Sequence, residues 1–254
     1  MKYGSVDEVI RRTNYSLPMS YPGMHHLIKR WGIIKSAGPN SKLSEALTVL
    51  TQLSDSKIPL ERLYKNLPPS FKTSLSTMHR ILHNVKEGVI RRYGTALVVT
   101  REGEENNVLT GIDKDHNKNL TLPMTYSIYK ENPKASILRV LQQEVFTELA
   151  VEKKFPFKVI PKNPKPFMFL NIADIKVAVY LIKLNKDIIE NYQFTSQKIY
   201  NHAFISCREI KSLNYGVRAG VENIVSGYER YLKNQSSVVL ETSDINLALL
   251  QVWR

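Results

Sequence analysis

The residues of this chain that are best suited to chemistry lie between positions 131 and 144. Seven residues separate Glu131 from Arg139, and Leu141 and Glu144 follow on the same predicted helix, which covers residues 133–149. Carboxylate oxygens are the ligands that Mg²⁺ prefers, and one or two of them commonly hold the ion together with substrate phosphates. Metal binding is therefore the chemistry to examine first.

The spacing resembles the loop–helix motif of Nudix hydrolases. That motif reads glycine, five residues, glutamate, seven residues, and then Arg-Glu-aliphatic-any-Glu-Glu-any-Gly; Glu131, Arg139, Leu141 and Glu144 match it. In the family, the helical glutamates hold Mg²⁺ or Mn²⁺ against a pyrophosphate, and the metal neutralises developing charge and activates water. The resemblance implies an α/β/α sandwich with a mixed sheet, and a pair between Glu131 and Arg139 that supports the loop.

The chain departs from the motif at the positions that bind metal. Thr125 replaces the loop glycine, Val140 the first helical glutamate, Gln143 the first of the paired glutamates, and Phe146 the closing glycine. Val140 cannot ligate a metal and Gln143 is neutral, so Glu144 is the one candidate metal ligand left on the helix. The prediction is a degenerate site without a cofactor. Glu131, Arg139 and Glu144 are its residual catalytic candidates, and Mg²⁺ or Mn²⁺ is expected only if hydrolysis survives.

The predicted elements around the motif have the order that the resemblance implies. Apolar alternation predicts strands before and after the helix, and helical spacing predicts a second helix near the end. The predicted strands cover residues 89–93, 95–100, 106–112, two segments within 167–184, and 201–206, and the closing helix covers 219–232. An apolar segment at 245–253 can pack back on the domain or form a dimer contact.

Three helices are predicted ahead of these strands, over residues 42–54, 60–66 and from Thr73 or Ser74 to Glu87. This order is that of a winged helix-turn-helix, whose third helix enters the major groove of DNA. The predicted fold class is therefore α+β, with a winged helix-turn-helix domain followed by the Nudix-like sandwich. The predicted parts are an irregular or helical extension (1–40), the winged helix domain (41–93), the Nudix-like domain (94–235) and a tail (236–254).

Positive charge is concentrated in the region of the predicted winged helix. The formal net charge is +13, and residues 21–93 hold 12 lysines and arginines against 4 acidic residues. This distribution favours a polyanion partner. The residues predicted to contact nucleic acid lie on the third helix and the first wing strand: Lys72, Thr73, Ser74, Ser76, Thr77, Arg80, His83, Asn84, Arg91 and Arg92. Among them, Arg80 is suited to guanine edges and Asn84 to adenine edges.

Composition excludes several other classes of protein. Cys207 is the only cysteine, which excludes a disulfide framework and a cysteine-rich zinc site, and it is predicted to be a small buried residue. No run of 18 apolar residues is present, and the first twelve residues lack the apolar core of a secretory signal. The expected location is the cytoplasm, with no membrane partner.

The predicted function is DNA binding by a transcription regulator whose degenerate Nudix-like domain senses a ligand or acts as a scaffold. A nucleotide or nucleotide-sugar is the ligand class considered, with Tyr126 and Tyr129 as residues that could stack on it, although packing explains both equally well. Two alternatives remain open. One is a weak Nudix pyrophosphohydrolase acting on nucleoside diphosphate derivatives, and the other is an RNA-binding or assembly protein. A homodimer is a further expectation.

Overall fold

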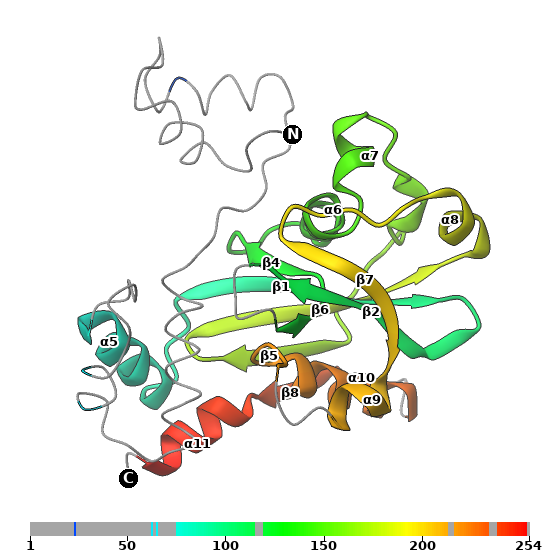
Figure 1. Cartoon of the computed structure of the whole chain (residues 1–254). Helices are drawn as coiled ribbons and strands as arrows, with labels where there is room; N and C mark the ends of the chain where they lie inside the picture. The colour runs from blue at the N-terminus through cyan, green and yellow to red at the C-terminus, as the bar shows by residue number, and fades with distance from the viewer. Residues whose placement is uncertain are drawn as a thin grey trace.

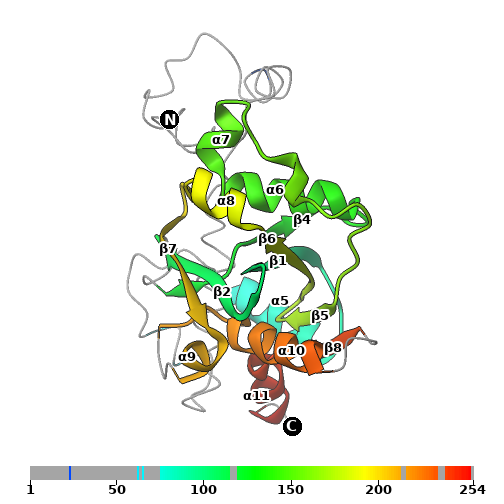
Figure 2. The ribbon, with the colours of Figure 1, turned by 90° about the vertical axis from the view of Figure 1, so that its right-hand side faces the viewer.

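The computed structural model describes residues 75–114, 119–212, 216–233 and 238–252, together with Gly23, Arg62 and Lys65. Over these residues the chain forms one mixed sheet that lies between two layers of helices (Figures 1 and 2). The α+β class and the mixed sheet are therefore confirmed. Apart from those three single residues, the predicted extension (1–40) and the predicted helices at 42–54 and 60–66 lie outside the described residues.

Eight strands make up the sheet that the described residues form. They are β1 (Arg92–Arg101), β2 (Glu104–Asp113), β3 (Leu120–Thr121), β4 (Met124–Ser127), β5 (Met168–Ile172), β6 (Ile175–Leu184), β7 (Ile199–Ser206) and β8 (Val239–Thr242). The central pair is β1 and β6, which run parallel from Arg92 beside Ile175 to Arg101 beside Leu184. β2 and β4 pair antiparallel with β1, and β7 pairs antiparallel with β2. All strands predicted from residue 95 onward are present.

Side chains of β1 alternate between two hydrophobic cores, one on each face of the sheet. Ala96 and Val98 point to one core, and Leu97 and Val99 point to the other. Because both faces are covered, the strand reads as a continuous apolar run. One face carries α6 (Pro133–Glu144), α7 (Thr147–Val151), the 3-10 helix η1 (Phe157–Val159) and α8 (Lys186–Asn191). The opposite face carries α5 (Leu75–Lys86), α9 (Cys207–Ser212), α10 (Val221–Lys233) and α11 (Asp244–Val252), as Figure 2 shows.

The helix that carries the motif is shorter than predicted. Asn132 caps it by accepting a hydrogen bond from the backbone N of Lys134 at 2.9 Å, and Pro133 occupies its first turn, where a missing N–H costs nothing. The predicted end at residue 149 is wrong, because α6 ends at Glu144 and α7 starts at Thr147. The break follows from tertiary pairing: the backbone of Thr195 donates to the carbonyl of Val145 and accepts from the N–H of Thr147.

The third predicted helix and the apolar tail pack against each other. The predicted buried face of α5 (Met78, Ile81, Leu82 and Val85) lies in the same core as Ile245 and Leu249 of α11. The tail therefore packs back on the domain. The predicted strand over 89–93 is wrong as a separate wing: residues 89–91 form no strand, and β1, the central strand, begins at Arg92.

No helix within the described ranges is both long and apolar enough to cross a lipid bilayer.

Candidate functional site

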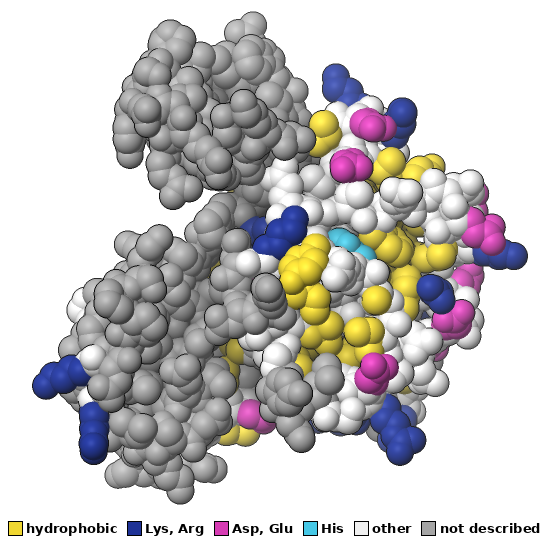
Figure 3. All heavy atoms as spheres, viewed as in Figure 1, with side chains coloured by type: hydrophobic (Ala, Val, Ile, Leu, Met, Phe, Trp, Pro, Cys, Tyr) yellow, Lys and Arg dark blue, Asp and Glu magenta, His cyan; other side chains and the backbone are white. Residues whose placement is uncertain are grey.

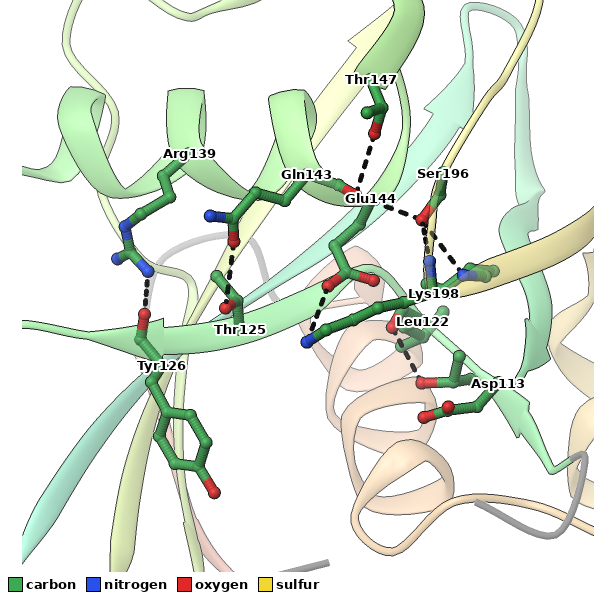
Figure 4. Close-up of polar contacts among 12 residues, drawn as sticks. Asp113, Leu122, Thr125, Tyr126, Arg139, Gln143, Glu144, Thr147, Ser196 and Lys198 are labelled. Carbon is green, nitrogen blue, oxygen red and sulfur yellow. Dashed lines mark hydrogen bonds and ion pairs between the residues drawn. The ribbon is translucent and has the colours of Figure 1, made fainter. Parts of the chain in front are cut away.

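Glu144, the glutamate that the motif retains near the end of α6, is buried against the sheet. Its side chain forms an ion pair with Lys198, whose Nζ lies 3.6 Å from Oε1 (Figure 4). Lys198 precedes β7 and is itself 22 % exposed, whereas the glutamate side chain is 2 % exposed. The backbone carbonyl of Glu144 is also occupied, since the ring Nε2 of His202 lies 2.8 Å from it. The carboxylate assigned to a metal by resemblance is thus neutralised by a lysine of the same chain.

A second ion pair stands beside the first. Asp113 ends β2 and is buried, and Nη1 of Arg218 lies 3.3 Å from its Oδ2. Burial raises the pKa of the Glu144 carboxyl, while Lys198 and Arg218 act to lower it and Asp113 acts to raise it. Two carboxylates and two cations therefore share this buried region, and their formal charges balance.

The residues that replace the family's other glutamates do not form a metal site. Val140 is fully buried in the core between α6 and the sheet. The side-chain carbonyl of Gln143 accepts a hydrogen bond from the Thr125 hydroxyl at 3.3 Å (Figure 4). Within the part of the chain that the structure describes, no three His, Cys, Asp or Glu side chains are grouped as a metal would require. The residues present thus do not fit Mg²⁺ or Mn²⁺.

The part of the motif that survives holds the loop between β4 and α6. Arg139 pairs with Glu131 through two hydrogen bonds, one from Nε at 3.3 Å and one from Nη2, as the resemblance implies. Arg139 also donates to the backbone carbonyl of Tyr126, and Glu131 accepts from the backbone N of Ile128 at 3.3 Å. The ion pair between Glu131 and Arg139 therefore holds the loop at both ends. Its role is structural.

Tyr126 and Tyr129, the two residues predicted to stack on a ligand, lie on opposite faces of the sheet. Tyr126 points away from Arg139 and α6 in Figure 4 and packs against the core on the α5 side, where the Arg92 guanidinium lies 5.6 Å from its ring centre. Burial raises the pKa of its hydroxyl. Tyr129 is 61 % exposed and contacts Tyr93 at a ring distance of 4.9 Å. One pocket formed by both tyrosines is therefore excluded.

Most of the predicted nucleic-acid contacts that can be located are on the surface. Ser76, Arg80 and His83 are exposed on α5, Thr77 is half-buried, and Arg91 and Arg92 are exposed ahead of and at the start of β1. Basic side chains project at the edge of the molecule where α5 lies (Figure 3). Lys72, Thr73 and Ser74 lie outside the described residues.

The prediction for Asn84 is wrong. This side chain is 4 % exposed, and its Nδ2 donates to Oδ2 of buried Asp174 at 2.9 Å. Its position on α5 follows the buried stripe of Ile81 and Val85, because residues three or four apart share a helix face. Asn84 therefore anchors the helix to the sheet and cannot contact a base.

Lys198, Arg218 and Asp113 were not predicted as site residues. Lys198 lies 54 residues after its partner, and no local motif marks it. The one available signal was physical: a glutamate retained on the buried side of a helix needs a cation, from a metal or from the chain. Which cation supplies it cannot be read from spacing.

No protein-family model matches the sequence, and no curated protein matches it. Among solved structures, the chain is similar to an Ap4A hydrolase from C. elegans, with 14 % identity, 56 % of this chain and 98 % of that chain covered, and a TM-score of 0.39. It is also similar to a Nudix hydrolase from Nitrosomonas europaea, with 13 % identity, 60 % of this chain and 78 % of that chain covered, and a TM-score of 0.43. A third similar structure is the Nudix domain of Shewanella oneidensis NrtR in a complex with ADP ribose. Its identity is 11 %, 69 % of this chain and 99 % of that chain are covered, and the TM-score is 0.40. At these values an activity has to be argued from the residues of this chain.

Proposed function

We propose that this chain is a DNA-binding regulator with a Nudix-like domain that binds without hydrolysing. The ion pair between Lys198 and Glu144 is the observation that supports binding without hydrolysis. A divalent ion at Glu144 would have to displace a lysine ammonium from a buried carboxylate. Among the residues that the structure describes, the second carboxylate of this region, Asp113, is already paired with Arg218. Metal-assisted attack on a pyrophosphate needs the metal to neutralise charge and to activate water. Neither role has a ligand set here.

The basic surface of α5 supports the proposal that the chain binds DNA. The apolar face of α5 packs in the main core, which fixes the orientation of the helix. Arg80 and His83 therefore point to the solvent. Exposed Arg91 and Arg92 follow within one short connection. Arginine side chains on an exposed helix can form two hydrogen bonds to guanine, and neighbouring arginines can hold phosphates. The excess of positive charge between residues 21 and 93 adds the electrostatic attraction that nucleic-acid binding requires.

Selection of bound sequences from a random pool of duplex DNA tests the regulator proposal. A selected duplex should bind with an affinity that falls steeply with salt, because phosphate contacts release counterions. Arg80→Ala should relax the base preference, whereas Lys165→Ala, which changes an exposed lysine in the loop before β5, should not. Binding that is absent, or that does not depend on salt, would refute the proposal.

Hydrolysis is tested separately. The purified chain is incubated with Mn²⁺ or Mg²⁺ and a panel of nucleoside diphosphate derivatives that includes ADP-ribose and Ap4A. No turnover above that of a heat-denatured sample is expected. Turnover that Glu144→Gln abolishes would establish the hydrolase alternative instead.

A further inference from the structure

We propose that a row of aromatic and basic side chains at one end of the sheet binds a strand of single-stranded nucleic acid. The row consists of Tyr129, Tyr93, Lys176 and Phe169, and we call it the rim platform. It lies on the α6 face of the sheet, whereas α5 covers the opposite face. The proposal is therefore independent of duplex binding by α5 and goes beyond it.

Strand register places these residues in one line across the sheet. Tyr93 of β1 lies beside Lys176 of β6, and Lys176 lies beside Asn171 of β5. Side chains two residues apart on a strand share a face, so Tyr93 points to the side of Leu97, and Lys176 to the side of Tyr180, which is the α6 side. By the same rule Phe169 and Asn171 share that face. The line therefore runs from the loop after β4, through β1 and β6, to β5.

Contacts between neighbours along the row hold its rings close to cations. The rings of Tyr129 and Tyr93 are 4.9 Å apart at an interplanar angle of 40°. Nζ of Lys176 lies 4.9 Å from the ring centre of Phe169, and Nζ of Lys130 lies 5.2 Å from that of Tyr129. α6 covers the next residues along the strands, because Tyr180 is buried beneath it and interacts with Ser136. The strand residues of the rim platform lie next to the part of the sheet that α6 covers.

The loop that presents Tyr129 is fixed in advance of any binding. Glu131 accepts hydrogen bonds from the backbone of Ile128 and from Arg139, and Arg139 also binds the carbonyl of Tyr126. These ties bracket Tyr129, whose side chain is 61 % exposed although its loop is anchored on both sides. A large aromatic ring held open to solvent loses little conformational freedom when a base stacks on it. The surviving part of the motif therefore supports this ring.

A nucleic-acid strand is the occupant that fits the chemistry of the row. Bases stack on aromatic rings irrespective of sequence, and lysines beside the rings attract the phosphates between bases. Adjacent strands are about 4.8 Å apart, so a row that crosses from β4 to β5 extends roughly 14 Å, more than one base can cover. Glu131, the nearest acidic residue in the loop, is already neutralised by Arg139. The platform is thus positive in net charge and long enough for successive bases.

Fluorescence anisotropy of the full chain with labelled dT12 and U12 oligonucleotides tests the platform. Tyr129→Ala should weaken binding by at least about fivefold, the loss that removal of one stacked base produces. Lys176→Gln should lower the slope of log affinity against log salt by about 0.7, the value for one phosphate of a single strand. Phe157→Ala is the matched control, because Phe157 is 63 % exposed but lies on η1, outside the row. Each variant is first checked for a native unfolding transition.

The outcomes separate this proposal from the regulator proposal. Loss of strand binding in Tyr129→Ala and Lys176→Gln, with Phe157→Ala and Arg80→Ala unchanged, supports the platform even if duplex DNA does not bind. Strand binding that is unaffected by Tyr129→Ala and Lys176→Gln overturns it, even if duplex binding through Arg80 is real. Equal competition by thymidine monophosphate and by dT12, per nucleotide, would also overturn it, because the site would then be one for a single nucleotide.

Discussion

Nζ of Lys198 lies 3.6 Å from Oε1 of Glu144, where the resemblance to Nudix hydrolases implies a divalent metal. The ammonium group of a lysine neutralises the Glu144 carboxylate, but it does not activate a water molecule for attack as a divalent metal does. The ion pair therefore balances the charge of Glu144 without supplying the chemistry of a metal. Glu144 and Arg218 belong to the same buried group, with Asp113 as the second acid. Retention of a glutamate in a motif is therefore poor support for catalysis unless its counter-charge is known.

The Glu144 carboxyl should make stability depend on pH. Burial raises its folded-state pKa above the ordinary value of 4.5, so the folded protein holds this proton more tightly than the unfolded chain. The resulting stabilisation is complete below the unfolded pKa and is lost as pH rises through the folded pKa. Glu144→Gln cannot titrate. The free energy of unfolding of the wild type, minus that of Glu144→Gln, should therefore decrease as pH rises from about 4.5.

Urea unfolding of both proteins between pH 4.5 and 8 measures this difference. Glu102→Gln, at an exposed glutamate in the turn between β1 and β2, is the control for removal of a carboxylate. A difference for Glu144→Gln that increases with pH would mean that Lys198 and Arg218 outweigh burial.

Restoring the family's first helical glutamate should damage the fold and should not create an enzyme. Val140 is fully buried in the apolar cluster between α6 and the sheet, so Val140→Glu places a carboxylate among the apolar side chains of that cluster. An uncompensated buried charge costs roughly 3–5 kcal/mol. Gln143→Glu, at a half-buried position on the same helix, should cost less than about 1 kcal/mol. Denaturant unfolding measures both, and a Val140→Glu variant that is as stable as the wild type and binds Mn²⁺ would contradict the loss of the metal site.

The sequence was informative where local patterns determine structure, and uninformative where distant residues do. The continuous apolar run of β1 and the buried stripe of α5 were both readable, because burial on each follows a short period. The break after Glu144 was not, since it depends on backbone pairing with Thr195. The same limit applies to Asn84 and to Lys198, whose partners lie 90 and 54 residues away along the chain.

Asn84→Ala should lower stability without changing base preference. The substitution leaves the buried carboxylate of Asp174 without the amide donor that lies 2.9 Å from it, and an unsatisfied buried group costs about 1–3 kcal/mol. His83→Ala, one residue earlier on the exposed face, should change the free energy of unfolding by less than about 0.5 kcal/mol. Thermal or urea unfolding distinguishes the two. If Asn84→Ala instead altered the selected DNA sequence while leaving stability intact, α5 would have to turn on binding.

Cys207 should be almost inert in the native protein. Its side chain lies in the main core, as the sequence predicted, and burial raises the pKa of the thiol to about 11, with Glu229 adding to the effect. Only the thiolate reacts with thiol reagents, and at pH 8 about one thiol in a thousand would be ionised at that pKa. Labelling with 5,5′-dithiobis(2-nitrobenzoic acid) at pH 8 should therefore be at least about a hundredfold slower than for a small free thiol. In 6 M guanidinium chloride, roughly the concentration that unfolds stable domains, the rate should match the free thiol. Fast labelling of the native chain would show that α9 separates readily from the core, because Cys207 is the first residue of this helix and is buried there.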